Sequence, residues 1–152
     1  MKLRVLWIGK TKDAGLTRWI SDYSSRIQRF LPLEIGEVKE PRIEESRRMQ
    51  AEGEKILAAV DSSDRVVVLD PRGETWTSEQ FAAFVQKHMR NDSRRLTFVI
   101  GGFSGLSADV KKRAEVTWSL SPMTFTHDLS RVLVLEQLYR ALSIIHNHPY
   151  SK

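Results

Sequence analysis

The sequence predicts an α/β fold in which a mainly parallel sheet is flanked by helices. Segments rich in β-branched and apolar residues alternate along the chain with segments whose apolar residues recur at helical spacing. Two of the strand segments, residues 65–70 and 96–100, are apolar almost throughout, which is typical of strands covered on both faces of a parallel sheet. The 152 residues show no repeat, linker or low-complexity tract, so we expect one domain over residues 1–152.

The first part of the chain is predicted to form a strand, a helix and a second strand. Residues 2–8 are rich in strand-forming residues. Apolar residues then recur at helical spacing from Leu16 to Phe30, and Pro32 ends this helix. Residues 33–38 follow as a short strand.

The middle of the chain repeats this order. Charge is dense in residues 39–48, which we interpret as a mobile loop leading into a helix that ends near Val60. The apolar strand of residues 65–70 comes next, and the Pro-Arg-Gly sequence at 71–73 is predicted to turn the chain.

The last part of the chain is predicted to contain three helices and two strands. Residues 77–80, Thr-Ser-Glu-Gln, have the spacing of a capping box and predict a helix to about Arg90. The second buried strand follows, and a short helix starts near Ser107. Residues 118–120 form a last short strand, and residues 129–145 form a long helix.

Three short segments stand out because each follows a predicted strand: Leu69 with Asp70, Gly101 with Gly102, and residues 120–125. In open α/β sheets ligands bind outside the carboxyl ends of the strands, so these segments are expected to form one pocket. Glycine lets the main chain approach a flat ligand closely. The 120–125 loop mixes apolar side chains with free backbone groups and has no cluster of cations. These features favour an adenine ring and a thioether over a triphosphate.

Other kinds of site are disfavoured by the same residues. The alternative for Gly101 and Gly102 is a tight strand exit and nothing more. They match neither a P-loop, which needs a following Gly-Lys-Ser/Thr, nor the G-x-G-x-x-G dinucleotide pattern. No serine sits on a G-x-S-x-G elbow. The absence of cysteine excludes disulfides and thiolate ligands, and the four histidines lack ligand spacing, so no metal site is expected.

Charge and hydropathy bound the partners. The chain has 24 Lys+Arg against 19 Asp+Glu, a net charge of +5, which suits a polyanionic partner such as RNA. No segment reaches the roughly 20 apolar residues of a membrane span. The apolar run at the N-terminus is too short and too charged for a signal peptide. We therefore expect a cytoplasmic protein without a membrane partner.

The motifs of the C-terminal third are specific as a set. They are residues 98–106 (FVIGGFSGL), 120–127 (LSPMTFTH), 131–141 (RVLVLEQLYRA) and 148–150 (HPY). Together they closely resemble the ribosomal RNA pseudouridine methyltransferases of the SPOUT superfamily, and the resemblance extends over the whole chain.

The resemblance implies a C-terminal segment that threads a loop to make a trefoil knot, a homodimer, and S-adenosyl-L-methionine bound in the knot as the methyl donor. It implies methylation at N3 of a pseudouridine in a stem-loop of the large-subunit (23S) ribosomal RNA, with the large ribosomal subunit or the assembled ribosome as partner. The sequence departs from the family at Thr126, where the family commonly has proline, and at Ser151, where it usually has histidine. The predicted donor contacts, including Gly102 from the strand-end argument, are Leu69, Gly101, Gly102, Leu120, Ser121, Pro122, Met123, Thr124 and Phe125.

Three residues are candidates for the chemistry. The imide proton on N3 must leave before the nitrogen attacks, and His127 is the first candidate base. Arg131 is a candidate to hold a phosphate or to stabilise the imide anion. Tyr150 lies in a tail that is a candidate to close over the site. The alternatives are a structural histidine, a salt bridge and an ordered terminus. Lys10 and Lys12 are either RNA contacts or solvated lysines.

Two interpretations of the chain as a whole remain open. One is the methyltransferase, and the other is a non-catalytic RNA- or nucleotide-binding α/β module. The presence of the full donor loop favours the enzyme. The helix of residues 129–145 carries apolar residues on more than one face, which we interpret as a sign of a partner subunit.

Overall fold

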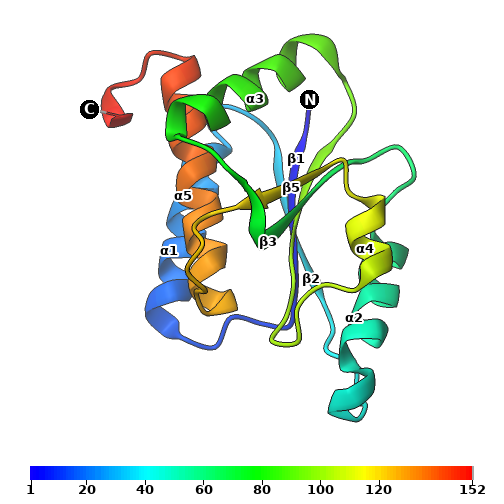
Figure 1. The fold of residues 1–152 in the computed structure, drawn as a ribbon. Helices are drawn as coiled ribbons and strands as arrows, with labels where there is room; N and C mark the ends of the chain where they lie inside the picture. Colours follow the sequence, from blue (N-terminus) through cyan, green and yellow to red (C-terminus); the bar gives the residue numbers. More distant parts are fainter. Residues whose placement is uncertain (152) are drawn as a thin grey trace.

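The computed structural model describes residues 1–151, apart from the side chain of Ser151. All neighbouring strands pair in parallel, in the order β2-β1-β4-β3-β5 (Figure 1). The central strands are covered on both faces, as their apolar sequences predict, and the α/β parallel-sheet prediction is confirmed. The strands are β1 (Leu3–Ile8), β2 (Leu33–Val38), β3 (Arg65–Thr75), β4 (Leu96–Ile100) and β5 (Val116–Ser119).

The helices form one layer on each face of the sheet (Figure 1). The first layer consists of α1, α3 and α5, and its core includes the inward side chains of β1 and β4. The second layer consists of α2 and α4, which pack on the opposite face in a smaller core. The helices are α1 (Ala14–Ile27), α2 (Glu45–Ala59), α3 (Ser78–Asn91), α4 (Ala108–Arg113), α5 (His127–Ile145) and the short 3-10 helix η1 (Pro149–Ser151).

The long helix α5 lies between α1 and α3. Val134, Leu135, Leu138 and Leu142 on this helix are all fully buried within the single chain. The interpretation that a second apolar face needs a partner subunit stays a prediction, because α1, α3 and the sheet bury most of the helix but leave Leu129 exposed and Leu133 partly exposed. A central helix of a layer needs a wide apolar surface even in a monomer.

Strand β3 differs from the prediction. It continues through the Pro-Arg-Gly segment to Thr75 instead of ending in a turn at residues 71–73. Leu69 and Glu74 both pair with Trp118 of β5, so the four residues between them leave the ladder as an excursion. A Cβ atom on Gly73 would lie 2.6 Å from the Thr117 carbonyl oxygen, so the excursion needs glycine to cross β5 this closely.

Local signals placed other boundaries well. Thr77 and Gln80 form the predicted capping box of α3, with both reciprocal hydrogen bonds present. Helix α2, in contrast, begins at Glu45, inside the segment predicted to be a loop.

None of the helices in residues 1–151 combines the length and the apolar character that crossing a bilayer requires.

Candidate active site

A cavity of about 550 Å³ lies where the carboxyl ends of three neighbouring strands meet. The excursion of β3, the loop after β4 and the loop after β5 form its walls. This is the position that an open parallel sheet offers to a ligand. No lysine or arginine is among its lining residues, which come from the described part of the chain. The lining residues are Leu69, Asp70, Pro71, Ile100, Gly101, Gly102, Phe103, Gly105, Leu106, Leu120, Ser121, Met123, Thr124, Phe125, Thr126, His127 and Ser130.

The structure brings together nearly all of the predicted donor contacts. Pro122 is exposed and does not line the cavity. The predicted contacts that do line it are Leu69, Gly101, Gly102, Leu120, Ser121, Met123, Thr124 and Phe125.

Hydrogen bonds hold the loop after β5 against the excursion of β3. The Ser119 hydroxyl lies 3.0 Å from the Pro71 carbonyl oxygen and 2.9 Å from the Ser121 carbonyl oxygen. The backbone N–H of Met123 donates to the Ser121 hydroxyl at 3.0 Å. The side chain of Met123 remains 73% exposed. The loop therefore has a fixed base and an apolar side chain available at the rim.

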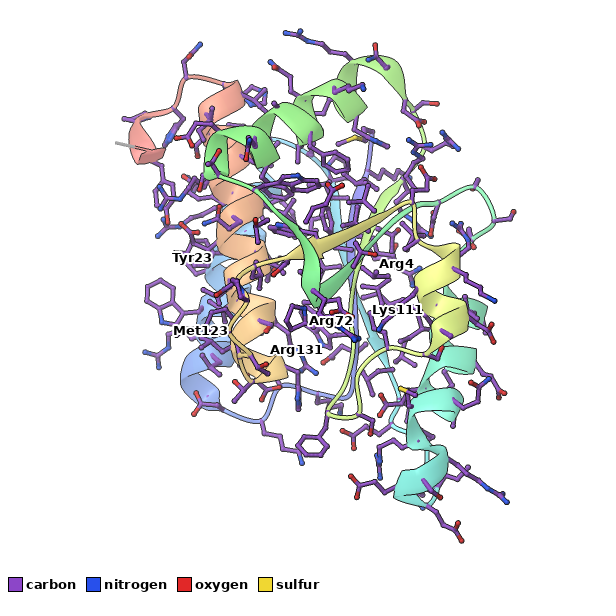
Figure 2. All side chains as sticks on the ribbon, viewed as in Figure 1. Arg4, Tyr23, Arg72, Lys111, Met123 and Arg131 are labelled. Carbon is purple, nitrogen blue, oxygen red and sulfur yellow. The ribbon has the colours of Figure 1, made fainter. Side chains whose placement is uncertain are left out.

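Asp70 supplies a carboxylate to the wall of the cavity. Its oxygens lie 2.9 Å from the Lys111 ammonium and accept from the Arg72 backbone N–H at 2.8 Å. Burial alone would raise the pKa of this carboxyl, but these hydrogen bonds outweigh burial and lower it. Arg72 of the excursion and Lys111 of α4, both labelled in Figure 2, form ion pairs with it. Asp70 is thus ionised and locally neutralised.

His127 is the first residue of α5 and lines the cavity. Its side chain is about one-third exposed, and its Nε2 atom lies 3.5 Å from the Asp128 carboxylate. Thr126 caps the helix by accepting a hydrogen bond from the Leu129 backbone N–H at 3.3 Å. A proline at position 126 has no side-chain oxygen for this cap, so the departure from the family pattern has a structural use here.

Arg131 does not reach the cavity. Its side chain is 1% exposed, and it donates hydrogen bonds to the Ile8 carbonyl oxygen at 2.5 Å and to the Thr11 hydroxyl at 2.8 Å. The guanidinium also stacks 5.0 Å over the Trp7 ring. Burial lowers the pKa of Arg131. The label in Figure 2 shows it inside the molecule, beside α5.

Within one chain this burial does not support a contact of Arg131 with phosphate or the reacting base, which stays a prediction. Its link to the site is indirect, because its Nη1 atom lies 3.2 Å from the same Asp128 oxygen that faces His127. It is a positioning residue that connects the end of β1 to the start of α5.

Tyr150 lies away from the cavity within one chain. Its hydroxyl donates to Glu136 at 3.0 Å and lies 3.1 Å from the Tyr23 hydroxyl. Glu136 is nine residues after His127, about 13 Å along the helix. The C-terminus and the start of α5 accordingly lie at opposite ends of that helix (Figure 1). Burial, together with these partners, raises the pKa of Tyr150. Closure of the tail over the cavity of its own chain is thus not seen.

The other candidate cations and polar residues are either exposed or engaged in contacts within the chain. Lys10 and Lys12 are exposed and line a separate groove of about 670 Å³. Arg140 forms an ion pair with Glu136 at 2.7 Å, so its guanidinium is already engaged within the chain. His148 is exposed beside Phe30. The departure at position 151 concerns a side chain that lies outside the described residues.

Sequence reasoning missed two residues beside the cavity. Phe103, at the tip of the loop after β4, is 82% exposed, and Glu52 of α2 is 2% exposed and lies against Gly102. An exposed phenylalanine directly after a glycine pair is a signal that could have been used. The sequence gives no such signal for Glu52, because the place of this residue depends on how α2 packs on the sheet. Within residues 1–151 no three His, Asp or Glu side chains form a metal-binding group.

Comparison with known proteins agrees with this geometry. A family model described as a predicted SPOUT methyltransferase matches residues 1–151. The chain is 44% identical over 153 residues to the ribosomal RNA large subunit methyltransferase H of Trichlorobacter lovleyi, covering 99% of both proteins. It is 42% identical to the protein of the same name from Geobacter sulfurreducens, again over 99% of each.

Solved structures give the same fold. A probable methyltransferase from Bordetella pertussis superposes with a TM-score of 0.58 at 14% sequence identity, over 92% of this chain and 93% of that one. The chain therefore shares its fold with that protein. The family model and the full-length relatives show that the chain belongs to the SPOUT methyltransferase family.

Proposed function

We propose that this protein transfers the methyl group of S-adenosyl-L-methionine to N3 of a pseudouridine in a stem-loop of the large-subunit (23S) ribosomal RNA. The observation that carries the proposal is the single cavity formed by the excursion of β3 and the loops after β4 and β5, with His127 in its wall. The full-length relatives are named as large-subunit ribosomal RNA methyltransferases, which supports the choice of RNA.

The residues of the cavity fit the methyl donor. Leu69, Leu120 and Phe125 offer apolar surface to an adenine ring or a thioether, and Gly101 and Gly102 allow close approach of the backbone. S-adenosyl-L-methionine carries no phosphate, which agrees with a lining free of lysine and arginine. The donor supplies an electrophilic methyl group on a sulfonium.

The protein must do two things to the acceptor. It must hold N3 in line with the methyl group, and proximity of this kind supplies much of the acceleration. It must also receive the imide proton, and His127 is our candidate because it borders the cavity and histidine titrates near neutral pH. The Asp128 carboxylate lies 3.5 Å from the imidazole and 3.2 Å from Arg131, so it is placed to orient His127.

We further propose a cytoplasmic homodimer with a knotted C-terminal segment, as the resemblance implies. One observation supports the dimer independently of α5. Trp19 on α1 is 51% exposed and stacks on Tyr23 at 5.6 Å, and such an exposed aromatic is typical of an interface. In a dimer, the second chain also supplies a tail with Tyr150. Tyr150 therefore stays a candidate residue for the site.

The test is a methyl-transfer assay with labelled donor. Assembled ribosomes and protein-free ribosomal RNA serve as substrates, and the modified position is mapped. We expect transfer to one pseudouridine, at N3, with assembled ribosomes the better substrate. Donor binding without transfer to any RNA would instead support the non-catalytic binding module. Transfer to a base other than pseudouridine would contradict the proposed specificity.

A further inference from the structure

A second cavity adjoins the donor cavity. It measures about 250 Å³ and shares three lining residues with its larger neighbour, namely Gly102, Phe103 and His127. The partition between the two is therefore the short Gly-Phe segment after β4 and the first residue of α5. Any group placed in the second cavity lies next to the donor and next to the candidate base.

Glu52 is the buried member of the three carboxylates that line this second cavity, which also contains Arg48. Its side chain lines the cavity and is 98% buried, since its residue exposure is 2%. In the part of the chain that the structure describes, its Oε2 atom has no hydrogen-bond partner and no cation forms an ion pair with it. Burial raises its pKa, against the opposing effects of Arg48 one turn earlier and of the Gly102 backbone. A buried carboxylate oxygen in this condition lacks a donor.

Gly102 fits closely against this carboxylate. A Cβ atom on Gly102 would lie 2.6 Å from Glu52 Oε2, so a larger residue would separate the partition from the acid. Glycine at this position thus serves the second cavity, whereas Gly101 faces Leu106 in the donor cavity. The two adjacent glycines are explained by two different close contacts.

Phe103 adds a stacking surface at the rim. Its side chain is 82% exposed, although it belongs to the lining of both cavities. An exposed aromatic face beside a polar pocket is the arrangement that proteins use to stack an unpaired base.

The second cavity opens toward a basic groove. The groove of about 670 Å³ shares Glu40 and Arg48 with it. Five cations line the groove against two carboxylates, Glu37 and Glu40. A cationic groove that leads to a small cavity with an aromatic rim matches a nucleotide, whose phosphates stay in the groove while the base enters. The cations are Lys10, Lys12, Lys39, Arg42 and Arg48.

We propose that the second cavity receives the acceptor base, with Phe103 stacked on the ring and Glu52 accepting a hydrogen bond from the N1–H of pseudouridine. This inference rests on the proposed function. Pseudouridine is joined to ribose through carbon, so it carries N–H groups at both N1 and N3, whereas uridine carries one at N3 alone. A carboxylate that binds N1–H selects pseudouridine over uridine and turns N3 toward the partition.

The experiment compares two variants of Glu52. Glu52→Met keeps the length of the side chain and removes the acceptor, and Glu52→Gln removes the charge but keeps a carbonyl oxygen that can accept from N1–H. Kinetics are measured on ribosomes that carry pseudouridine or uridine at the mapped position, with donor affinity measured by calorimetry. Glu54→Met, an exposed change on the same helix outside both cavities, is the control.

We expect Glu52→Met to lower kcat/KM on the pseudouridine substrate by about 10- to 100-fold, the range of a hydrogen bond to a charged group. Its preference for pseudouridine over uridine should fall by the same factor, and donor affinity should stay within about twofold of wild type. Glu52→Gln should recover most of the preference. A general base at Glu52 would instead be lost in both variants, which separates the two roles.

Three outcomes would overturn the inference: an unchanged preference in Glu52→Met, no recovery in Glu52→Gln, or an equal loss of donor affinity. Phe103→Leu provides an independent test that does not depend on the core, because this side chain is exposed. We expect its KM for RNA to rise about tenfold, from the usual worth of one stacked base, and to change by more than the donor affinity, although Phe103 borders both cavities. Absence of any transfer by the wild type would contradict the proposed function itself, before the variants are compared.

Discussion

Gly101 shows at the scale of one residue how the backbone shapes the donor cavity. A Cβ atom there would lie 2.9 Å from Leu106 Cδ2 and 3.3 Å from the Gly105 carbonyl carbon. Leu106 lines the same cavity, so any side chain at position 101 must push it or take its space. The requirement for glycine is steric, since this position does not have a left-handed backbone.

We predict that Gly101→Val abolishes binding of S-adenosyl-L-methionine while the protein still folds. The branched side chain takes space at the wall of the cavity, and the loop around it is partly exposed, so we expect the core to stay intact. Calorimetric titration with the donor measures the affinity, and circular dichroism checks the fold. Wild-type affinity in a folded Gly101→Val protein would contradict the assignment of the cavity.

Arg131 shows the limit of residue-scale inference. In the sequence, Arg131 lies near the start of a predicted helix and close to the donor loop. A cation in this place is a reasonable candidate to bind a phosphate. Its burial depends on Trp7 and Ile8, more than 120 positions away, which receive the guanidinium. Sequence spacing carries no information about such a contact.

The structural role of Arg131 gives a second prediction. Arg131→Ala should lower the free energy of unfolding by about 2–3 kcal/mol, because the hydrogen bonds to Ile8 and Thr11 disappear and a void remains. Arg131→Lys should restore only part of this, because an ammonium cannot reproduce the planar stack and both bonds. Denaturant titration measures the change. Unchanged stability with weakened RNA binding would favour the phosphate contact.

At the scale of elements, local patterns predicted most boundaries. Apolar spacing located α1, the capping-box spacing located α3, and continuous apolar runs located β3 and β4, because a helix or a buried strand is defined by its own residues. The excursion of β3 was not predictable in this way. Its four residues leave the ladder because Leu69 and Glu74 both pair with Trp118, and that pairing involves a strand more than 40 residues later.

An ion-pair network joins the starts of β3 and β4. Asp64, at 3% exposure, accepts hydrogen bonds from Arg95 at 3.0 and 2.9 Å and from the Thr97 hydroxyl at 3.2 Å. Burial acts to raise the pKa of Asp64, but these donors outweigh it and hold the pKa below its ordinary value. The carboxylate therefore ties two neighbouring strands together at the end opposite the cavities.

The network predicts a dependence of stability on pH. Because the pKa of Asp64 is lower in the folded than in the unfolded state, its contribution is present above the unfolded value of about 3.9 and is lost as pH falls below it. Asp64→Asn should cost about 3 kcal/mol at pH 7 and should flatten the acid limb of the stability profile.

Denaturant unfolding between pH 7 and pH 3 tests this, with Asp22→Asn as the matched control. Asp22 pairs with Arg26 at 3.0 Å on the exposed side of α1, and removing such a surface pair should cost less than about 0.5 kcal/mol. Equal losses in the two variants would show that the Asp64 network adds nothing beyond a surface ion pair.

At the scale of the whole molecule, the three cavities lie in one series. The basic groove shares Arg48 with the second cavity, which shares His127 with the donor cavity. The donor end of this series is recognisable in the sequence because strand exits carry their own local signals. The acceptor end is not, because it combines residues from α2, the loop after β2 and the loop after β4.

Assembly into a dimer is the fourth prediction. The interface is expected to use exposed apolar residues such as Leu129 on α5, and Trp19 on α1 is our candidate for its centre. Sedimentation of the wild type at micromolar concentration should give a dimer. Trp19→Ala should weaken association by at least about tenfold, because interface tryptophans carry a large share of the binding energy. A monomeric wild type would contradict the dimer, and an unaffected variant would move the interface elsewhere.

The last prediction concerns the grip on RNA. A net charge of +5 is small for a protein that must find one nucleotide in a large RNA, so the cations that matter must be concentrated. Lys10 and Lys12 are exposed in the basic groove, whereas Arg131 is buried and does not line the groove. Lys10→Ala combined with Lys12→Ala should weaken ribosome binding and flatten its salt dependence. The logarithmic slope should change by roughly 0.7–0.9 for each phosphate that the variant no longer neutralises.

Binding across a salt series, with donor titration alongside, measures both effects. The control removes two lysines that do not line the groove, Lys2 before β1 and Lys87 on α3, which are also exposed. This pair lowers the net charge by the same amount, so long-range attraction falls equally in the two proteins while direct binding of phosphates differs. A wild-type salt slope in the Lys10/Lys12 variant would mean that these lysines are only solvated. A slope reduced equally in both variants would mean that net charge, and not the groove, holds the RNA. A loss of donor affinity in the Lys10/Lys12 variant alone would show that the groove and the donor cavity are coupled through the second cavity that lies between them.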